Sequence, residues 1–243
     1  MTPFGLANAP SAFQRWINRE LGSLLGETCA VYLDDIVIFS NGNIEDHWIK
    51  VREVLDRLNR AGLKLDPKKC EFAVKETKYL GFVINVNQGI RADTKKIEAI
   101  SSWKAPTNLK GVRSFLGFAN FYRNFIKNFA HISNPLHELT KKGTSFKWGS
   151  EQETAFTTLK RSFSTAPILA MWQEDRETVL ETDASGWATG GCLSQFDERG
   201  LLRPVAYHSK KLSPIECNYD IHDKELLAII RCLHEWRGEL IGL

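Results

Sequence analysis

The stretch AVYLDDIVIFS, residues 30–40, carries two adjacent aspartates, Asp34 and Asp35, between two apolar runs. Short apolar runs rich in β-branched and aromatic residues are typical of buried strands, and two such runs separated by two residues predict a tight hairpin. The turn of that hairpin usually carries Asn-Gly or Asp-Gly, because it needs positive φ. Two carboxylates repel by roughly 4 kcal/mol at about 4 Å when the effective dielectric constant is near ~20. The pair therefore needs an explanation beyond the turn itself.

Two explanations fit the Asp34–Asp35 pair from its local pattern. In the first, buried flanking strands hold a rigid acidic tip for two Mg²⁺ ions, which prefer hard oxygen ligands and leave positions open for water and phosphates. Two such ions activate an attacking hydroxyl and stabilise a leaving pyrophosphate. In the second, the two residues form a polar turn that holds no metal.

The composition is that of an ordinary globular protein, with 243 residues, 43% hydrophobic and 25% charged. A net charge of +3 is too small to indicate nucleic-acid binding by itself. The five cysteines form no CxxC pair and are odd in number, which favours reduced thiols in an intracellular protein of the cytoplasm or nucleus. No run approaches the ~18 apolar residues of a membrane span, and the first ten residues have no signal-peptide pattern.

The predicted elements change in character along the chain. The first part has a helix over 11–26 capped by Ser11, the hairpin over 28–40, a helix over 43–62, and short strands over 63–66, 70–74 and 77–85. The helix over 43–62 has its apolar positions at Ile44, Trp48, Val51, Leu55 and Leu58. The middle part is helical, over 94–103, 108–126, 132–143 and 150–167, with Ser150 as the cap of the last helix. Strands over 178–185, 186–195 and 201–212 and a helix over 214–237 end the chain.

Two further carboxylates lie in this last part. Asp183 ends a predicted strand, where it serves either as a metal ligand or as an ordinary Asx turn. Glu225 falls in the middle of an apolar helix face made by Ile221, Ala228, Ile229, Cys232 and Trp236. Because an unpaired buried carboxylate is costly, Glu225 needs a cation, a proton, a cleft or a salt bridge with Arg or Lys. Asp183 and Glu225 are thus either half of a second metal site or structural residues.

Two other segments leave alternatives open. The stretch 2–13, TPFGLANAPSAF, has small residues that let a backbone approach a flat ligand closely, or it is a plain loop leading into a helix. Basic residues of the helical part are either contacts for phosphates or a solvated basic face. They are Lys110, Arg113, Arg123, Lys127, Lys141 and Lys142.

Taken in order, these motifs resemble the Pol polyprotein of gypsy-type LTR retrotransposons. TPFGLANAPSAFQ is similar to the segment that touches the incoming nucleotide and the template, and YLDD (32–35) to the reverse transcriptase signature. YLGFVI (79–84) is similar to the primer-grip hairpin, 109–142 to the thumb, 146–169 to the connection and 180–195 to the start of RNase H. Several motifs in the correct order make this resemblance specific, whereas YxDD alone would not.

The resemblance implies roles for particular residues. Asp34 and Asp35 are implied as catalytic metal ligands of the polymerase, and Asp183 and Glu225 as those of RNase H. The residues implied to bind substrate are Phe4, Gly5, Gln14, Tyr32, Leu80, Gly81, Lys110, Arg113 and Arg123. The implied cofactor is Mg²⁺, with two ions in each complete site. The implied partners are an RNA or DNA template–primer, an RNA–DNA hybrid, deoxynucleoside triphosphates and the remainder of the polyprotein, with no membrane.

The resemblance also implies an α+β fold class. It consists of a polymerase palm over 1–92, a helical thumb over 93–143, a connection over 144–175 and a partial RNase H-like α/β domain over 176–243. In the family, a third palm aspartate and the fingers come before this stretch, and further RNase H carboxylates come after it. We therefore expect both metal sites to be incomplete in this chain. It is either part of an active polymerase and nuclease, or an inactive or repurposed remnant that at most binds nucleic acid.

Overall fold

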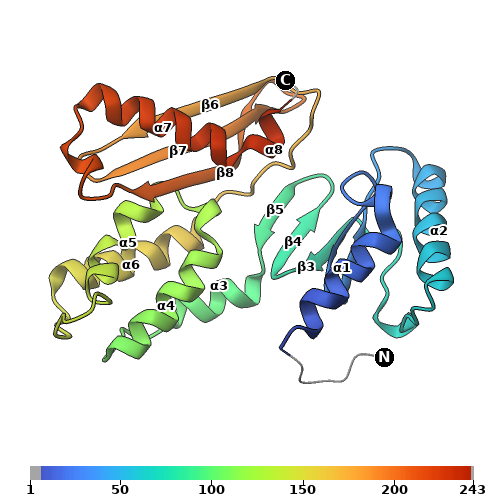
Figure 1. Ribbon diagram of the computed structural model, residues 1–243, viewed down its shortest axis with the longest axis horizontal. Helices are drawn as coiled ribbons and strands as arrows, with labels where there is room; N and C mark the ends of the chain where they lie inside the picture. The colour runs from blue at the N-terminus through green and yellow to red at the C-terminus, as the bar shows by residue number, and fades with distance from the viewer. Residues whose placement is uncertain (1–6, 242–243) are drawn as a thin grey trace. The chain divides into compact units, whose positions relative to one another are not determined.

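The computed structural model describes residues 7–241. The chain divides into two compact units, with the boundary in sequence between Leu80 and Gly81 (Figure 1). Each unit is described by itself. None of the helices in the described part has the length and apolar character that crossing a membrane requires. All five cysteines are free.

The first unit is built from two helices and a two-stranded hairpin. Its elements are α1 (Ala9–Leu21), a 3₁₀ turn (Gly22–Leu24), β1 (Cys29–Tyr32), β2 (Asp35–Ile38), α2 (Ile44–Arg60), a second 3₁₀ turn (Pro67–Lys69) and β3 (Glu76–Tyr79). Strands β1 and β2 pair antiparallel, as predicted. The core joins Ile17 and Leu21 of α1, Cys29 of β1, and Val54 and Leu58 of α2. This apolar packing of α1 and α2 around the hairpin fixes where the strands end.

The first helix differs from its prediction at both ends. It begins at Ala9 with Asn8 as its N-cap, so Ser11 lies inside the helix and donates its hydroxyl to the Asn8 carbonyl at 3.0 Å. Pro10 fits the first turn because its missing N–H would have no partner there. The helix ends at Leu21 because Gly22 has a φ of 51°, a conformation that glycine adopts easily and that breaks α-helical geometry.

Three other predictions for this unit are wrong. Residues 63–66 and 70–74 form no strands. Pro67 opens a 3₁₀ turn whose N-cap is Asp66, and Ala73 has a φ of 50°, which interrupts extended backbone. On α2, Ile44 and Trp48 are exposed and Val54 is in the core instead. Trp48 stacks on Phe72 with ring centroids 6.2 Å apart, so an aromatic partner from the following loop covers it in part.

The second unit begins with a hairpin and four helices. Strands β4 (Phe82–Asn85) and β5 (Gly89–Ala92) pair antiparallel, and α3 (Thr94–Ser101), α4 (Leu109–Phe121), α5 (Phe129–Glu138) and α6 (Ser150–Ser164) follow. Strand β5 was not predicted. The helices share a core that includes Phe115, Leu136, Phe156 and Leu159. Helix α6 begins at Ser150 as expected, but its N-cap is Gly149, whose N–H donates to Gln152 Oε1 at 3.1 Å.

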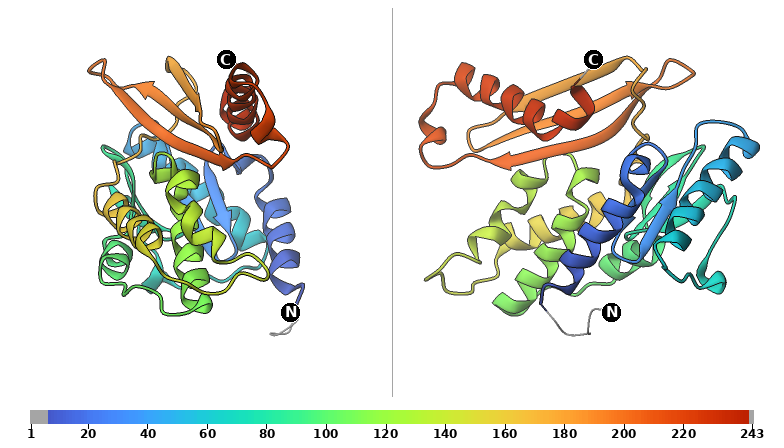
Figure 2. Two further views of the ribbon diagram at one scale, coloured as in Figure 1. Left: turned by 90° about the vertical axis from the view of Figure 1, so that its left-hand side faces the viewer. Right: turned by 45° about the vertical axis from the view of Figure 1, so that its right-hand side comes forward.

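The rest of the second unit is a three-stranded sheet with a helix on one side. Its strands are β6 (Thr178–Ala184), β7 (Ala188–Phe196) and β8 (Leu202–Lys211), antiparallel in the order β6-β7-β8. Helix α7 (Ile221–Glu235) lies along this sheet and is followed by α8 (Arg237–Leu240) (Figure 2). Cys232 and Trp236 pack on Leu193 of β7. Gly191 permits this approach, since a Cβ there would lie 2.4 Å from Cys232 Sγ.

The single helix predicted over 214–237 is in fact two elements. A 3₁₀ turn (Glu216–Asn218) comes first, and α7 starts at Ile221 with Asp220 as its N-cap. The apolar face predicted for this helix is also only partly buried. Ala228, Cys232 and Trp236 are buried, whereas Ile221 and Ile229 are 53% and 41% exposed. The reason is that α7 packs against β6 and β7 along one narrow face only.

Polar contacts join the helices of the second unit to its sheet. Lys211 Nζ, at the end of β8, donates to Asn134 Oδ1 at 2.6 Å and to Glu138 Oε1 at 2.7 Å on α5. The Ala130 N–H donates to Ser209 Oγ at 3.1 Å. These contacts place β8 next to α5, so the helical part and the sheet form one body.

Candidate functional site

The candidate polymerase site is the turn between β1 and β2. Tyr32 pairs with Asp35, so the turn residues are Leu33 and Asp34, and Asp35 is the first residue of β2. This corrects the expected tip by one residue. The reason is the backbone of Leu33, whose φ of 54° is left-handed. Such a φ suits glycine and costs about 1–2 kcal/mol for a residue with a Cβ, so neighbouring contacts must stabilise it.

Those contacts come from Gln14 on α1. The Leu33 N–H donates to Gln14 Oε1 at 2.7 Å. Gln14 Nε2 donates to the Val31 carbonyl at 3.2 Å and to Asn18 Oδ1 at 2.8 Å. Gln14, which the resemblance implied as a substrate contact, therefore bonds to the hairpin itself.

The two carboxylates at the turn are free of protein partners. Asp34 and Asp35 are exposed, and in residues 7–241 no hydrogen bond or ion pair involves either carboxylate. The Asp35 charge acts on a neighbouring tyrosine. Burial, and after it the Asp35 carboxylate, raise the pKa of Tyr79. Two adjacent oxygen donors that water and phosphates can reach fit a hard divalent cation. The described residues contain no group of three or more His, Cys, Asp or Glu side chains that could hold a metal.

The other implied substrate contacts fall in different places. Tyr32 is 55% exposed beside the two aspartates. Phe4 and Gly5 lie outside the described residues. Leu80 and Gly81 both have positive φ, at 50° and 81°. In the second unit, the Tyr122 hydroxyl donates to the Gly81 carbonyl at 3.0 Å, so an aromatic residue at the end of α4 supports this turn.

The acidic pair of the sheet comes from two separate elements. Asp183 is exposed near the end of β6 and pairs with Gly190 of β7. Glu225 is half-buried on α7, which packs against β6 and β7. Within the described residues, neither carboxylate has a hydrogen bond or an ion pair, so the salt bridge considered for Glu225 is not found there. Whether the two carboxylates share a metal stays a prediction.

The basic candidates are not equivalent. Lys110 and Arg113 are exposed on α4. Arg123 instead forms an ion pair with Glu235 of α7, with Nη2 and Oε1 3.5 Å apart, and Lys141 pairs with Glu138. Lys110 and Arg113 are therefore the better candidates for phosphate contacts. Sequence reasoning missed Gly117 and Phe121, which follow on the exposed side of α4; the available signal was a glycine in the middle of a helix.

Comparison with known proteins identifies these parts. Residues 1–84 match the family model described as reverse transcriptase (RNA-dependent DNA polymerase), and residues 148–243 match an RNase H-like domain found in reverse transcriptase. A retrovirus-related Pol polyprotein from transposon opus of Drosophila melanogaster is 40% identical over 99% of this chain. The chain thus carries a reverse transcriptase region and an RNase H-like region, and it is similar over nearly its whole length to transposon Pol polyproteins. It spans 25% of the length of that relative.

Solved structures agree with these two matches. A foamy viral protease-reverse transcriptase dRH in complex with double-stranded DNA matches 99% of the chain with a TM-score of 0.82 and 27% identity, over 42% of its own length. A foamy viral protease-reverse transcriptase in complex with an RNA/DNA hybrid matches 99% with a TM-score of 0.80 and 28% identity, over 32% of its length. The α+β class and the reverse transcriptase and RNase H-like nature of this Pol segment are thus confirmed.

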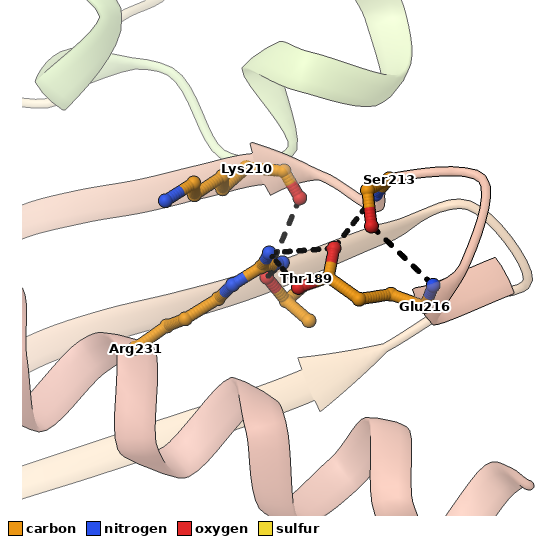
Figure 3. A network of polar contacts seen from close by, with 5 residues as sticks. All are labelled: Thr189, Lys210, Ser213, Glu216 and Arg231. Carbon is orange, nitrogen blue, oxygen red and sulfur yellow. Dashed lines mark hydrogen bonds and ion pairs between the residues drawn. The ribbon is translucent and has the colours of Figure 1, made fainter. Parts of the chain in front are cut away.

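A polar network that the sequence did not reveal supports the RNase H-like part of this Pol segment (Figure 3). Arg231 of α7 donates through Nη2 to both carboxylate oxygens of Glu216, at 2.8 and 2.9 Å, and through Nη1 to Thr189 Oγ1 of β7 at 3.1 Å. The Ser213 N–H donates to Glu216 Oε2 at 2.7 Å. Hydrogen bonds from Ser213 and the Arg231 charge lower the pKa of Glu216. The network therefore ties the loop after β8 to both α7 and β7.

Proposed function

We propose that this chain takes part in RNA-directed DNA synthesis, with Asp34 and Asp35 as Mg²⁺ ligands. The observation that supports this most strongly is the pair of adjacent, exposed carboxylates, which have no partner within residues 7–241, on a hairpin whose strands pack on α1. Their repulsion is unfavourable unless a cation joins them. When bound, Mg²⁺ supplies charge neutralisation and positioning for phosphoryl transfer. Deoxynucleoside triphosphates are the proposed substrates, and Tyr32 lies beside the carboxylates.

The proposed contact with a template–primer is the exposed side of α4. Lys110 and Arg113 supply positive charge, and Phe121 is 54% exposed. Gly117 lies between them, and a Cβ there would meet no atom within 4 Å. A mid-helix glycine costs about 1 kcal/mol relative to alanine, and no packing among residues 7–241 explains the glycine here. Close approach of a nucleic-acid backbone would explain a glycine at this position. The foamy viral structures with DNA and with an RNA/DNA hybrid support such a partner.

The proposed second activity is cleavage of RNA in a hybrid by the RNase H-like part. Asp183 and Glu225 are its proposed metal ligands, supported by carboxylates that have no partner in the described part of the chain and that lie on two elements that pack together. The palm, thumb, connection and RNase H-like boundaries at 92, 143 and 175 and an intracellular site of action remain part of this proposal.

A specific observation also favours a second function, in which the chain binds nucleic acid without catalysis. In the described residues no site brings together three or more metal-ligating side chains, and a two-carboxylate site should bind Mg²⁺ weakly. The α4 surface does not depend on those carboxylates. A remnant with an intact α4 surface would therefore bind a duplex but not extend a primer.

Primer extension separates the two functions. The purified 243-residue chain is assayed beside a version extended on both sides by its Pol sequence, each with and without Asp34→Asn. If the longer version extends the primer and Asp34→Asn abolishes this extension, the polymerase function is supported. Extension by neither version excludes it. Robust extension by the short chain alone, lost in Asp34→Asn, would show that two carboxylates suffice.

Duplex binding at several salt concentrations tests the α4 surface. Lys110→Ala and Arg113→Ala should each weaken binding of the 243-residue chain and lower the salt slope by about 1, because each phosphate contact releases roughly one counterion. Lys96→Ala on α3, an exposed lysine of the same unit, is the control and should change neither. No binding at low salt, or a flat salt response, would remove the nucleic-acid role.

A further inference from the structure

The turn that presents Asp34 and Asp35 has an unfavourable backbone. Leu33 has a φ of 54° although it carries a branched side chain, and its N–H points away from the β1–β2 ladder. Hairpin turns normally solve this with glycine or asparagine. Something outside the hairpin must therefore stabilise this conformation.

Gln14 is placed to do so. It lies on α1, and its side chain contacts the chain where β1 enters the turn, accepting from the Leu33 N–H at 2.7 Å and donating to the Val31 carbonyl at 3.2 Å. One amide thus satisfies a donor and an acceptor that the hairpin leaves unpaired. The Leu33 bond is the shorter and engages the residue with the left-handed backbone.

The Gln14 side chain is itself held in place. Its Nε2 also donates to Asn18 Oδ1, one turn further along α1, at 2.8 Å. Three residues after Gln14, Ile17 is fully buried in the core that joins α1 to α2 and β1. The amide therefore sits on a helix anchored against the same hairpin that it contacts, which is what a positioning contact requires.

We infer that Gln14 is a positioning residue, which sets the direction of the Asp34 and Asp35 carboxylates by holding Leu33 in its left-handed conformation. The inference rests on the proposed use of these carboxylates as metal ligands. It assigns Gln14 a role within the protein and not as a substrate contact. It also explains how leucine is tolerated where a hairpin turn would carry glycine.

Amide hydrogen exchange tests, without any metal, whether Gln14 holds the Leu33 backbone. In the 243-residue chain, Gln14→Met keeps the length of the side chain and removes its hydrogen bonds to Leu33, Val31 and Asn18, and should speed exchange of the Leu33 N–H about tenfold. Gln14→Glu keeps the acceptor and should retain most of the protection. Gln88→Met, at an exposed glutamine of the other unit, is the matched control. Unchanged exchange at Leu33 in Gln14→Met, or equal loss in Gln14→Glu, would overturn the inference.

A rescue experiment distinguishes positioning from simple stability. Leu33→Gly adopts positive φ without strain, so the order of the turn should depend less on Gln14 in that background. Chemical shifts of Asp34 and Asp35 should move in Gln14→Met and move several-fold less when Leu33→Gly is also present. Equal shifts in both backgrounds would contradict a role through the Leu33 backbone.

Mn²⁺ as a paramagnetic probe separates this inference from the proposed function. If Mn²⁺ broadens the Asp34 and Asp35 signals and Asp34→Asn removes the broadening, the metal site is supported. If Mn²⁺ causes no broadening in the wild-type chain, the proposed function fails. The exchange of the Leu33 N–H still tests the contact with Gln14 in that case. Where broadening occurs, Gln14→Met should require several-fold more Mn²⁺. Faster Leu33 exchange with an unchanged Mn²⁺ requirement would show that Gln14 does not position the carboxylates.

Discussion

The two acidic pairs of this chain are built in different ways. Asp34 and Asp35 are neighbours in sequence on a hairpin of two four-residue strands, β1 and β2, which Gln14 of α1 contacts through two hydrogen bonds. Asp183 and Glu225 lie on β6 and α7, so their relation depends on how a helix packs on a sheet. The arrangement of the first pair therefore depends mainly on local backbone structure, and that of the second pair on tertiary packing.

Because of this difference, we expect substitutions near the two pairs to affect the stability of the chain differently. The packing of α7 rests on a few close contacts, among them Cys232 against Gly191 and the Arg231–Glu216 pair. Substitutions there should unfold or displace α7 and so disturb Glu225 from a distance. Substitutions at the hairpin should change the charge or direction of its carboxylates with little effect on stability. The predictions below test that contrast in order of decreasing effect.

The largest effect is expected from Gly191→Val. A Cβ at this position would lie 2.4 Å from Cys232 Sγ and 3.2 Å from the Glu181 carbonyl, so overpacking should lower the free energy of unfolding by about 3 kcal/mol. Burial raises the pKa of Cys232 to about 11, so this thiol should resist alkylation at pH 8 in the wild type and react in the variant.

Gly186→Ala is the control for this substitution, because a Cβ there would meet no atom within 4 Å. It should leave both the urea unfolding midpoint and the alkylation rate of Cys232 near wild-type values. A stable Gly191→Val variant with an unreactive Cys232 would show that α7 does not depend on this contact.

Arg231→Met should come next and lower the free energy of unfolding by about 2 kcal/mol, because it leaves the Glu216 carboxylate without its charged partner, while the Ser213 N–H still donates to it. The Arg231 and Glu216 side chains are 11% and 20% exposed, which keeps the cost below that of a fully buried pair. The double variant Arg231→Met with Glu216→Leu should regain part of the loss in a urea titration. A double variant less stable than Arg231→Met would contradict this account.

A smaller effect is expected from acid. The pKa of Glu216 is lowered in the folded chain, so its contribution is present above the ordinary pKa of 4.5 and is lost as the pH falls through the lower, folded value. Unfolding followed between pH 6 and 3 should therefore show a steeper loss of stability in the wild type than in Glu216→Gln. Parallel curves would show that Glu216 does not contribute.

The smallest effect is expected at the hairpin. Asp34→Asn removes one of two neighbouring like charges that have no protein partner in residues 7–241, so stability should rise slightly, by well under ~1 kcal/mol because both groups are exposed. The same change should abolish Mn²⁺ broadening at the turn. A clear loss of stability would mean that Asp34 has a structural role.

The sequence predicted some elements well, for identifiable reasons. The hairpin, α2 and the strands β6, β7 and β8 were found because their apolar residues recur with the period of the element that forms, although Ile44 and Trp48 of α2 are exposed. The strand expected over 70–74 does not form, since Ala73 takes positive φ. Strand β5 was missed although its partner β4 is its neighbour in sequence; its other pairing, the bridge from Ile90 to Leu169, comes from a residue distant in sequence.

For the candidate site, residue types and their order in sequence were enough to propose Asp34, Asp35, Asp183 and Glu225. They could not reveal Gln14 as a contact of the Leu33 backbone, because a glutamine on a helix has many possible partners. Nor could they show that Arg123 is paired with Glu235 while Lys110 and Arg113 are exposed. Side-chain partners follow from packing, which local pattern does not contain.

The sequence by itself indicated the resemblance to Pol polyproteins, the hairpin and the adjacency of Asp34 and Asp35, because covalent adjacency and short-range periodicity need no tertiary information. Only the tertiary structure decided that Leu33 takes a left-handed backbone against Gln14, and that α7 starts at Ile221 after a separate turn. It also decided that Arg231 pairs with Glu216. The physical reason is that these features depend on which surfaces are buried together, and burial is a property of the folded chain as a whole.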